Sequence, residues 1–406
     1  MMGGGWWAIV GLLALAGVVL RHNLLFLMSL LSALIGGTSQ VWRRYCLAGV
    51  SYRRRLGNTR LFHGEETDLL IEIVNAKPLP LAWLRIRDEF PAQVELLAGR
   101  LLYGHRSDRR LLVNVLSLRW YEQVTRRYRL RGVRRGVWQF GPVEVASGDL
   151  FGLGSKREQY IQTETLLVYP KMVPVTALGL PAHHPFGDSR TKRRLLADPL
   201  RLMGAREYQP GDSYRHIHWK TTARKQSLQT KVFEPSASRL LAVFLNVNTF
   251  QFLYEGVDLE LVEFAITTAA SIARQAWEDG YQVGLYVNSV ASPGGERIRI
   301  RPGGHPEQLS RILEALTRVV EYGRWPIEAV LTTEAEALPY GTTVVAVTPL
   351  ITERLCKALL ELERREHAVS LVALGQARLD RPLPGIRYWH VGGREEWREL
   401  ESLELA

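Results

Sequence analysis

Cysteine is scarce in this chain of 406 residues: only Cys46 and Cys356 occur, far apart in the sequence. This scarcity excludes a disulfide framework and favours a reducing compartment or indifference to redox state. The patterns Gly-x-x-x-x-Gly-Lys, His-Glu-x-x-His and Gly-x-Ser-x-Gly are also missing. The chain therefore has no recognisable phosphate loop, metalloprotease helix or hydrolase nucleophile. We expect a protein that is not an enzyme and that needs no cofactor.

Acidic residues are sparse in the first part of the chain. Residues 1–231 carry 35 Lys and Arg against 17 Asp and Glu, a net charge of +18, whereas residues 232–406 carry 17 against 24, a net charge of −7. This asymmetry indicates a domain boundary near residue 231. It makes the first part the candidate for anionic partners.

Charge is absent from two long runs near the N-terminus, Met2–Leu20 and Leu24–Val41. At a rise of about 1.5 Å per residue, each run nearly spans the ~30 Å hydrocarbon core of a bilayer. The triplet Arg21-His22-Asn23 between them is typical of a tight turn outside the membrane. The sequence therefore predicts a transmembrane helical hairpin over residues 1–42.

The flank of this segment predicts its orientation. Six arginines lie between Arg43 and Arg60, and no acidic residue follows the second run before Glu65. By the positive-inside rule, the rest of the chain lies in the cytoplasm. Three alternatives stay open. They are a cleaved signal peptide (disfavoured because the first 20 residues have no cationic start), one span followed by an interfacial helix (since Gly36–Gln40 weakens the second run), and a buried soluble hairpin.

Residues 43–170 read as β structure. Leu69–Val74 and Trp83–Arg87 show short apolar or alternating patterns, and Arg126–Leu130 and Gly136–Val145 repeat them around glycine turns. Short strands separated by Pro and Gly are typical of a small antiparallel sandwich or barrel. We expect an antiparallel β-sandwich-like domain here.

Residues 171–238 are expected to be a linker, rich in Pro up to residue 205, followed by a dense polar segment. From 239 to 406 the pattern alternates between strands and helices, which predicts a mostly parallel sheet covered on both faces. The expected strands and helices are 240–247 (strand), 259–278 (helix), 283–287 (strand), 306–320 (helix), 344–347 (strand), 352–366 (helix) and 369–374 (strand). The whole chain is thus an α+β multidomain protein.

The dense polar segment runs REYQPGDSYRHIHWKTTARKQSLQTKVFEP from Arg206. Pro210-Gly211-Asp212 has turn chemistry, since Pro fixes φ and Gly permits the positive φ that follows. Two interpretations stay open: acidic residues pairing the arginines to clasp two domains together, or an Arg and Trp recognition surface. The candidate partner-binding or signature residues are Arg206, Glu207, Tyr208, Gly211, Asp212, Arg215, His218, Trp219, Ala223 and Arg224.

This run resembles the signature of the domain-of-unknown-function 58 family of bacterial membrane proteins. Further matches are Arg134–Pro142, Asp149–Leu153 and Leu167–Pro170, together with the membrane hairpin. The resemblance implies a von Willebrand factor A-like, doubly wound C-terminal domain. It also implies the bacterial inner membrane as location and a MoxR-type AAA ATPase as partner.

An A-type domain often holds Mg²⁺ through Asp-x-Ser-x-Ser after its first strand, with Thr and Asp ligands from later loops. The matching positions here are Asn246, Asn248 and Phe250, and the later loop offers Thr348 without a carboxylate. Hard cations prefer carboxylate and hydroxyl oxygens. We therefore expect a degenerate site that holds no metal, Asn246, Asn248 and Thr348 being its degenerate positions.

The leading hypothesis is a cytoplasm-facing scaffold or adaptor that binds a protein partner in the assembly or remodelling of a membrane-linked complex. A second hypothesis is that the basic half binds anionic lipid, which we favour over nucleic acid for a chain tethered to an anionic leaflet. Its cations include a block from Arg126 to Arg135 and 11 between residues 190 and 231. A third is a metal-dependent hydrolase using Asp212, His216 and His218, for which no third metal ligand with convincing spacing is found.

Overall fold

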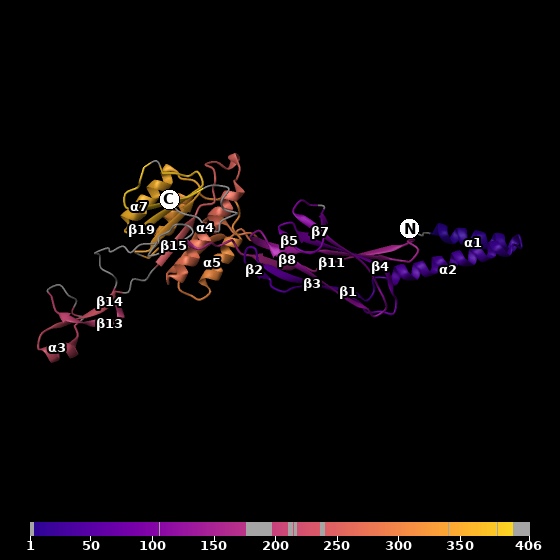
Figure 1. Cartoon of the computed structure of the whole chain (residues 1–406), viewed down its shortest axis with the longest axis horizontal. Helices are drawn as coiled ribbons and strands as arrows, with labels where there is room; N and C mark the ends of the chain where they lie inside the picture. Colours follow the sequence, from indigo (N-terminus) through magenta and orange to yellow (C-terminus); the bar gives the residue numbers. More distant parts are fainter. Residues whose placement is uncertain are drawn as a thin grey trace. The chain divides into compact units, whose positions relative to one another are not determined.

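The computed structural model describes residues 4–104, 106–175, 197–209, 214, 217–235, 240–339, 341–379 and 381–392. The chain divides into two compact units, Met1–Lys171 and Met172–Ala406. Unit 1 contains two helices and a set of mostly antiparallel sheets, and unit 2 contains an α/β sheet (Figure 1). The expected mixture of α and β structure, with an apolar helix near the N-terminus and several sheets, is confirmed.

Unit 1 begins with two apolar helices, α1 (Gly4–Val19) and α2 (Asn23–Tyr45). Among the described residues, α2 is the helix long and apolar enough to cross a membrane, and only 17% of its apolar window is buried; α1 is shorter. The two helices pack closely. The Ser29 hydroxyl donates to the Val10 carbonyl at 2.9 Å, and a Cβ on Gly17 would lie 2.7 Å from the Phe26 backbone nitrogen.

The strands of unit 1 form three sheets with orders β1-β3-β8-β5, β11-β10-β4-β7-β6 and β2-β12-β9. Their bounds are β1 (Val50–Leu56), β2 (Arg60–Leu61), β3 (Glu66–Asn75), β4 (Leu81–Pro91), β5 (Val94–Leu96), β6 (Leu101–Tyr103), β7 (Arg109–Leu118), β8 (Gln123–Gly132), β9 (Gly136–Phe140), β10 (Val143–Gly148), β11 (Ser155–Tyr160) and β12 (Glu164–Val168). Alternate residues of β1 and β3 are buried, as expected for strands with one face on a core. One apolar core collects side chains from all three sheets.

Two details of unit 1 differ from the sequence expectation. The single strand expected over Gly136–Val145 is divided into β9 and β10, because Gly141 has a φ of +85° and Pro142 has no amide hydrogen. β4 is also longer than expected, since it extends from Leu81 to Pro91.

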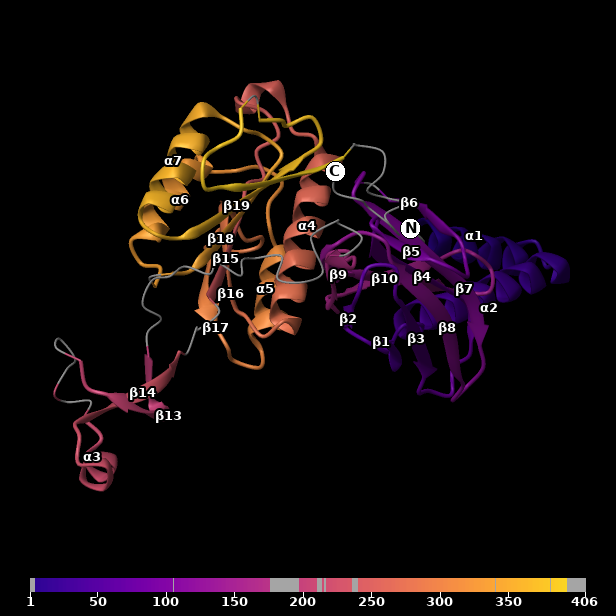
Figure 2. The same ribbon diagram turned by 60° about the vertical axis from the view of Figure 1, so that its left-hand side comes forward.

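Unit 2 is built on a six-stranded sheet of order β17-β16-β15-β18-β19-β20, in which all neighbours are parallel except β16 and β17. The elements are β15 (Leu240–Leu245), a 3-10 helix (Leu253–Glu255), α4 (Leu259–Glu278), β16 (Gln282–Val290), β17 (Arg297–Gly303), α5 (Gln308–Thr317), α6 (Ile327–Ala335), β18 (Thr343–Thr348), α7 (Glu353–Arg364), β19 (Ala368–Leu374) and β20 (Arg387–Val391). Helices α4 and α5 pack on one face and α6 and α7 on the other (Figure 2).

The sequence expected seven of these elements and missed the 3-10 helix, β17, α6 and β20. Helix α4 has the expected bounds because its N-cap Asp258 accepts from the Leu261 amide and its apolar face is long. A further two-stranded sheet pairs β13 (Ala197–Glu207) with β14 (Gln229–Pro235), with α3 (Trp219–Lys225) between them. Residues 197–205 therefore form part of a strand, where the sequence predicted a linker.

Candidate functional site

A cleft of about 670 Å³ lies at the carboxyl ends of the parallel strands of unit 2. Its walls come from the loop after β15, the segment that enters α6 and the loop after β18. The chain leaves β15 for β16 on one side and later returns to β18 on the other. The cleft thus lies where the winding of the sheet reverses, which is the usual ligand position in open α/β sheets.

Hydrogen-bonded amides form the base of this cleft. The Asn246 side-chain amide donates to the Thr348 hydroxyl at 2.9 Å, and the Asn288 amide donates to the Asn246 side-chain oxygen at 2.8 Å. The Asn288 oxygen accepts from the Val247 backbone amide at 2.9 Å. Asn246 and Asn288 are almost completely buried. We call these groups the Asn246 network. Because these groups form hydrogen bonds with one another, the bonds offset the free-energy cost of removing their polar atoms from water.

Two further contacts extend the Asn246 network to the wall of the cleft. The Asn248 side-chain oxygen accepts from the Gly323 backbone amide at 2.9 Å, and the Thr348 hydroxyl donates to the Leu350 carbonyl at 2.5 Å. A Cβ added at Gly323 would lie 2.3 Å from the Asn248 oxygen and 2.4 Å from the Asn288 nitrogen. Glycine at 323 therefore permits the close approach of the wall to the network.

The structure brings the three predicted degenerate positions, Asn246, Asn248 and Thr348, to one place. Their donor set does not fit a hard divalent cation, because an amide N–H group of Asn246 faces the Thr348 oxygen and no carboxylate joins them. Across the described residues, no group of three or more His, Cys, Asp or Glu side chains is arranged to hold a metal. Sequence reasoning missed Asn288, a polar residue near the end of a buried strand, which is a usable signal.

The rim of the cleft is aromatic and charged, and Glu328 and Glu353 line the cleft as well as two arginines. Phe252, Tyr254 and Tyr322 are exposed by 48%, 82% and 47%, and the rings of Phe252 and Tyr254 stack at 5.3 Å. Arg324 and Arg354 line the same cleft, and neither guanidinium forms an ion pair or hydrogen bond with a described residue. Aromatic side chains and arginine are the residues enriched in protein interfaces. The cleft can therefore take an acidic or aromatic segment.

The signature residues lie on the arm formed by β13, α3 and β14. Arg206 and Glu207 end β13, Tyr208 follows it, and Trp219, Ala223 and Arg224 belong to α3. Tyr208 stacks on Tyr214 at 5.9 Å between ring centroids. Gly211, Asp212 and Arg215 lie outside the described residues, as does His216. The side chains of Trp219 and Tyr214 are 68% and 74% exposed, so they are available for contact.

His218 has a local structural role. It is the N-cap of α3, where its Nδ1 accepts from the Thr221 amide at 3.2 Å. The Thr221 hydroxyl lies 3.1 Å from the same Nδ1, and the His218 amide donates to the Gln229 carbonyl of β14 at 2.8 Å. This geometry supplies a capping partner for the α3 amides.

The basic block of β8 is largely paired. Arg127 lies 3.2 Å from Asp68, and Arg131 lies 2.7 Å from Glu66, both across to β3. Arg126 donates to the Asn114 side-chain oxygen at 2.6 Å, and Arg135 is 8% exposed. The sheet thus uses these cations for cross-strand pairs.

Part of the chain matches a known protein family. Residues 204–386 match the family described as "Protein of unknown function DUF58". This match assigns residues 204–386 of the chain to DUF58. The match begins at residue 204 in β13, just before the signature run, and ends before β20, so the DUF58 region holds most of the arm and five strands of the six-stranded sheet. The family resemblance read from the signature is confirmed.

The chain is also similar to the uncharacterized protein YeaD of Bacillus subtilis (strain 168), at 29% identity over 242 residues. That alignment covers 59% of this chain and 56% of YeaD, so the chain spans little more than half of that relative. Solved structures with remote likeness include a cohesin module from Clostridium perfringens (TM-score 0.20, 11% identity, 29% of this chain and 96% of that chain). Another is the CARDB domain of the PF1109 protein from Pyrococcus furiosus (TM-score 0.19, 6% identity, 29% and 86%). At these scores neither likeness informs the DUF58 fold or function.

Proposed function

We propose that this DUF58 protein is a membrane-anchored scaffold that binds a protein partner in the cleft at the carboxyl edge of its unit 2 sheet. The observation that carries the proposal is the composition of that cleft. Its base is a closed set of neutral amides, and its rim presents stacked aromatic rings and two arginines without ionic partners. Such a surface offers recognition, and it offers neither a nucleophile with a general base nor a carboxylate cage for a metal.

We assign unit 2 to the von Willebrand factor A-like arrangement. The strand order β17-β16-β15-β18-β19-β20, with β17 alone antiparallel, supports this assignment, as do the helix pairs on opposite faces. In that arrangement the loops after β15 and β18 form the binding edge. The Asn246 network lies at the corresponding position and links those two loops through the 2.9 Å bond from Asn246 to Thr348.

The partner we propose is a MoxR-type AAA ATPase, engaged through an acidic segment. Arg324 and Arg354 are exposed on the cleft and suit carboxylates, which arginine binds in a planar, two-pronged geometry. The exposed rings of Phe252 and Tyr322 would cover the apolar part of the segment. Binding in such an interface concentrates in a few aromatic and arginine residues.

The anchor in this proposal is the N-terminal pair of helices, acting as a transmembrane hairpin in the bacterial inner membrane with both soluble units on the cytoplasmic side. The length and composition of α2 support a span, and Arg43 and Arg44 in its last turn support a cytoplasmic C-terminal end. The tight crossing of α1 and α2 at Gly17 supports two helices that enter the bilayer together.

The test is binding of the detergent-solubilised full-length chain to MoxR-type ATPases of the same genome. We expect Phe252→Ala combined with Arg354→Glu to lower the affinity at least about tenfold, because both side chains belong to the centre of the interface. The matched control is Tyr103→Ala combined with Arg311→Glu, which removes an 84% exposed ring and an exposed arginine away from the cleft. Equal binding by both variants, or no binding of any such ATPase by the wild-type chain, would refute the proposal.

The arm provides a second contact in the same proposal. Trp219 is 68% exposed at the start of α3, so Trp219→Ala removes little packing. We expect that variant to keep the thermal stability of the wild type and to bind the ATPase more weakly. Unchanged affinity would restrict the interface to the cleft.

A further inference from the structure

The loop between β10 and β11 in unit 1 is fastened to helix α2. Asp149 begins this loop and is 2% exposed, and its carboxylate accepts a hydrogen bond from the Ser39 hydroxyl of α2. The other oxygen of the same carboxylate accepts from the Leu153 backbone amide at 2.9 Å. The Asp149 amide in turn donates to the Gly154 carbonyl at 3.1 Å. One buried carboxylate therefore closes the loop and attaches it to the helix.

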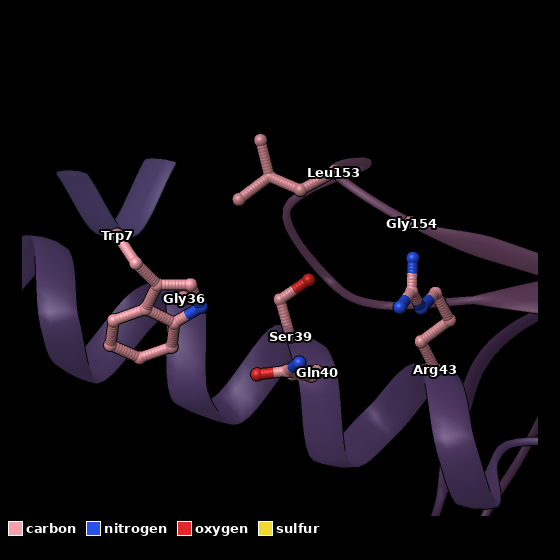
Figure 3. Close-up of a pocket in the computed structure, with 7 residues that line it drawn as sticks. All are labelled: Trp7, Gly36, Ser39, Gln40, Arg43, Leu153 and Gly154. Atoms are coloured by element: carbon pink, nitrogen blue, oxygen red, sulfur yellow. The ribbon is translucent and has the colours of Figure 1, made fainter. Parts of the chain in front are cut away.

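The same place includes the start of α1. A small hollow of about 10 Å³ is lined by Trp7 of α1, Gly36 and Ser39 of α2, and Leu153 of the loop, among other residues. Figure 3 shows the Trp7 ring beside Gly36 and the Leu153 side chain on the loop beyond Ser39. The loop thus packs on the two apolar helices themselves.

The tip of this loop is apolar and exposed. Leu150 and Phe151 are 66% and 53% exposed, although they lie next to a buried aspartate. An exposed pair of large apolar residues on an ordered loop marks a contact surface. The contact must lie beside α2, because Asp149 on one side of the pair and Leu153 on the other both touch the helices or line their hollow.

The length of α2 gives the depth of this contact. From Asn23 to Arg43 the helix rises about 30 Å, which equals the hydrocarbon thickness of a bilayer. Ser39 lies four residues before Arg43, so the Asp149 attachment is about 6 Å on the membrane side of the arginine flank. Side chains of Leu150 and Phe151 at this level meet the boundary between lipid headgroups and acyl chains.

A neighbouring loop has the same character. The Lys77 ammonium donates to the carbonyls of Cys46 and Ala48, just beyond the end of α2, at 2.5 and 2.6 Å. The Lys77 carbonyl accepts from the Tyr121 amide at 3.2 Å, which places the β7–β8 loop at this end of the sandwich. Trp120 and Tyr121 in that loop are 65% and 69% exposed. Trp and Tyr are the residues enriched at membrane interfaces.

We propose that the β10–β11 loop inserts Leu150 and Phe151 into the lipid interface, so that the bilayer holds the β-sheets of unit 1 at a second point besides the helices. This proposal rests on the membrane anchor proposed above. The occupant is the bilayer, because the Asp149–Ser39 bond fixes the base of the loop to the apolar helix α2 one turn before the Arg43–Arg44 flank, and Leu150 and Phe151 are exposed there. The consequence is that the sandwich has one fixed tilt relative to the membrane.

The experiment uses the full-length chain in vesicles of phosphatidylethanolamine and phosphatidylglycerol. An environment-sensitive fluorophore is attached at Phe151→Cys in a Cys356→Ser background. Cys46 is retained, because it is 0% exposed and burial raises the pKa of its thiol, which keeps it protonated and unreactive. The quencher is a lipid with a nitroxide on its acyl chain next to the glycerol.

The matched control is Ile161→Cys in the same hairpin. Ile161 is apolar and 89% exposed, and it follows the end of β11 that is remote from the loop. Six residues separate it from Ser155, which is about 20 Å along a strand. The two probes thus sit on one rigid hairpin and differ in their expected distance from the lipid.

Flotation of the vesicles is measured on the same samples. If the chain floats and the Phe151 probe is quenched about threefold more than the Ile161 probe, the inference holds. If the chain floats and the two probes are quenched equally, the loop does not insert, and the anchor stands alone. If the chain does not float with the vesicles, both the anchor and the loop insertion are refuted.

Discussion

Each unit has a buried polar cluster, and the two clusters differ in charge. In unit 1, the side chains of Arg54 and Asp88 are 0% exposed and lie 2.5 Å apart, while the Tyr52 hydroxyl donates to Asp88 at 2.6 Å. Arg54 also donates to the Gln162 carbonyl at 2.9 Å. In unit 2, the Asn246 network contains neutral amides and a hydroxyl only. The side chains of Arg54 and Asp88 in the charged cluster are fully buried, and the neutral cluster lies at the base of an open cleft.

The difference separates the roles of the two clusters. Arg54 belongs to β1 and Asp88 to β4, in different sheets, so their ion pair ties the two sheets together. A buried pair of this kind is costly to break because the remaining charge has no water. The Asn246 network instead joins the end of β15 to the end of β18 at the base of the cleft, and the charged residues that line this cleft, Arg324, Arg354, Glu328 and Glu353, include both signs. Charge thus lies in the core of the first unit and on the cleft lining of the second.

The largest expected effect is from Asp88→Asn. This change keeps the shape of the side chain and leaves the buried Arg54 guanidinium with Glu164, 3.8 Å away and 26% exposed, as its remaining carboxylate partner. We expect the free energy of unfolding of unit 1 to fall by about 3–5 kcal/mol. Thermal or urea unfolding of the detergent-solubilised chain measures it.

The control for this prediction is Glu144→Gln, one register position away. Val143 pairs with Asp88 and Glu144 with Arg87, and the Arg87–Glu144 contact of 3.3 Å is half-exposed. An exposed pair contributes under about 1 kcal/mol. If Asp88→Asn and Glu144→Gln lowered the free energy of unfolding equally, burial of the Arg54–Asp88 pair would not explain its contribution to stability.

A second, smaller effect is expected from Gly323→Ala at the cleft. The new Cβ would approach Asn248 and Asn288 to 2.3 and 2.4 Å and push the wall away from the Asn246 network. We expect a loss of about 1–3 kcal/mol in the stability of unit 2, as for overpacking. Partner binding should weaken in parallel.

Gly304→Ala is the comparison, since its Cβ would meet its nearest atom, in Gln282, at an ordinary 3.5 Å. That variant should keep both stability and binding. A Gly323→Ala chain with wild-type stability and affinity would mean that the network does not set the geometry of the cleft.

A third effect concerns the caps of the helices that begin at the cleft edge. Thr352 is the N-cap of α7 and accepts from the Leu355 amide at 3.1 Å. Thr352→Ala should cost about 1 kcal/mol of unit 2 stability by differential scanning calorimetry, and Thr352→Ser should restore it. No loss in the alanine variant, or no recovery with serine, would exclude the cap as the source.

The smallest effect is expected from pH. His367 in unit 2 is 7% exposed, and burial, with Arg365 nearby, holds the pKa of its imidazole below the ordinary value near 6.5. Above that value both folded and unfolded states have a neutral ring. As the pH falls through 6.5 the unfolded chain takes up a proton first, so the stability of unit 2 falls.

His367→Gln should reduce the loss of unit 2 stability as the pH falls from neutral to 5. The pKa of His63 in unit 1 is likewise lowered, by burial and by the positive charge of Lys171. His63→Gln should therefore reduce the acid-induced loss of stability in unit 1 alone. Stability curves recorded between neutral pH and pH 5 test both variants. A rise in stability on acidification that the histidine substitutions abolish would contradict the sign.

Sequence patterns predicted the elements whose residues bury one continuous face. The bounds of α4 follow from Asp258 as its cap and from an apolar face, and β15, β18 and β19 follow from unbroken apolar runs. The missed elements are edge strands and a short helix. β17 reads Arg297-Ile-Arg-Ile-Arg-Pro-Gly, and its pairing with β16 depends on a neighbour and not on its own composition.

The candidate site was predicted in part, for a physical reason. Asn246 and Asn248 follow β15 and Thr348 ends β18, so the parallel pairing of these strands brings them together. The contributions of Asn288 and Gly323 depend on backbone paths that the sequence does not encode locally. The weak apolar character of Gly36–Gln40 has a similar explanation: Gly36 and Ser39 are buried against α1 and the β10–β11 loop, where small and polar residues suit protein contact.

The most direct test of the account is a titration of Mn²⁺, as a magnetic stand-in for Mg²⁺, into the full-length chain in detergent, followed by electron paramagnetic resonance. If the Asn246 network is complete without an ion, the cleft holds no specific site for a divalent cation. We therefore expect no saturable Mn²⁺ binding that differs between the wild type and Asn246→Ala. Binding of one Mn²⁺ per chain that Asn246→Ala abolishes would contradict the neutral, protein-binding cleft.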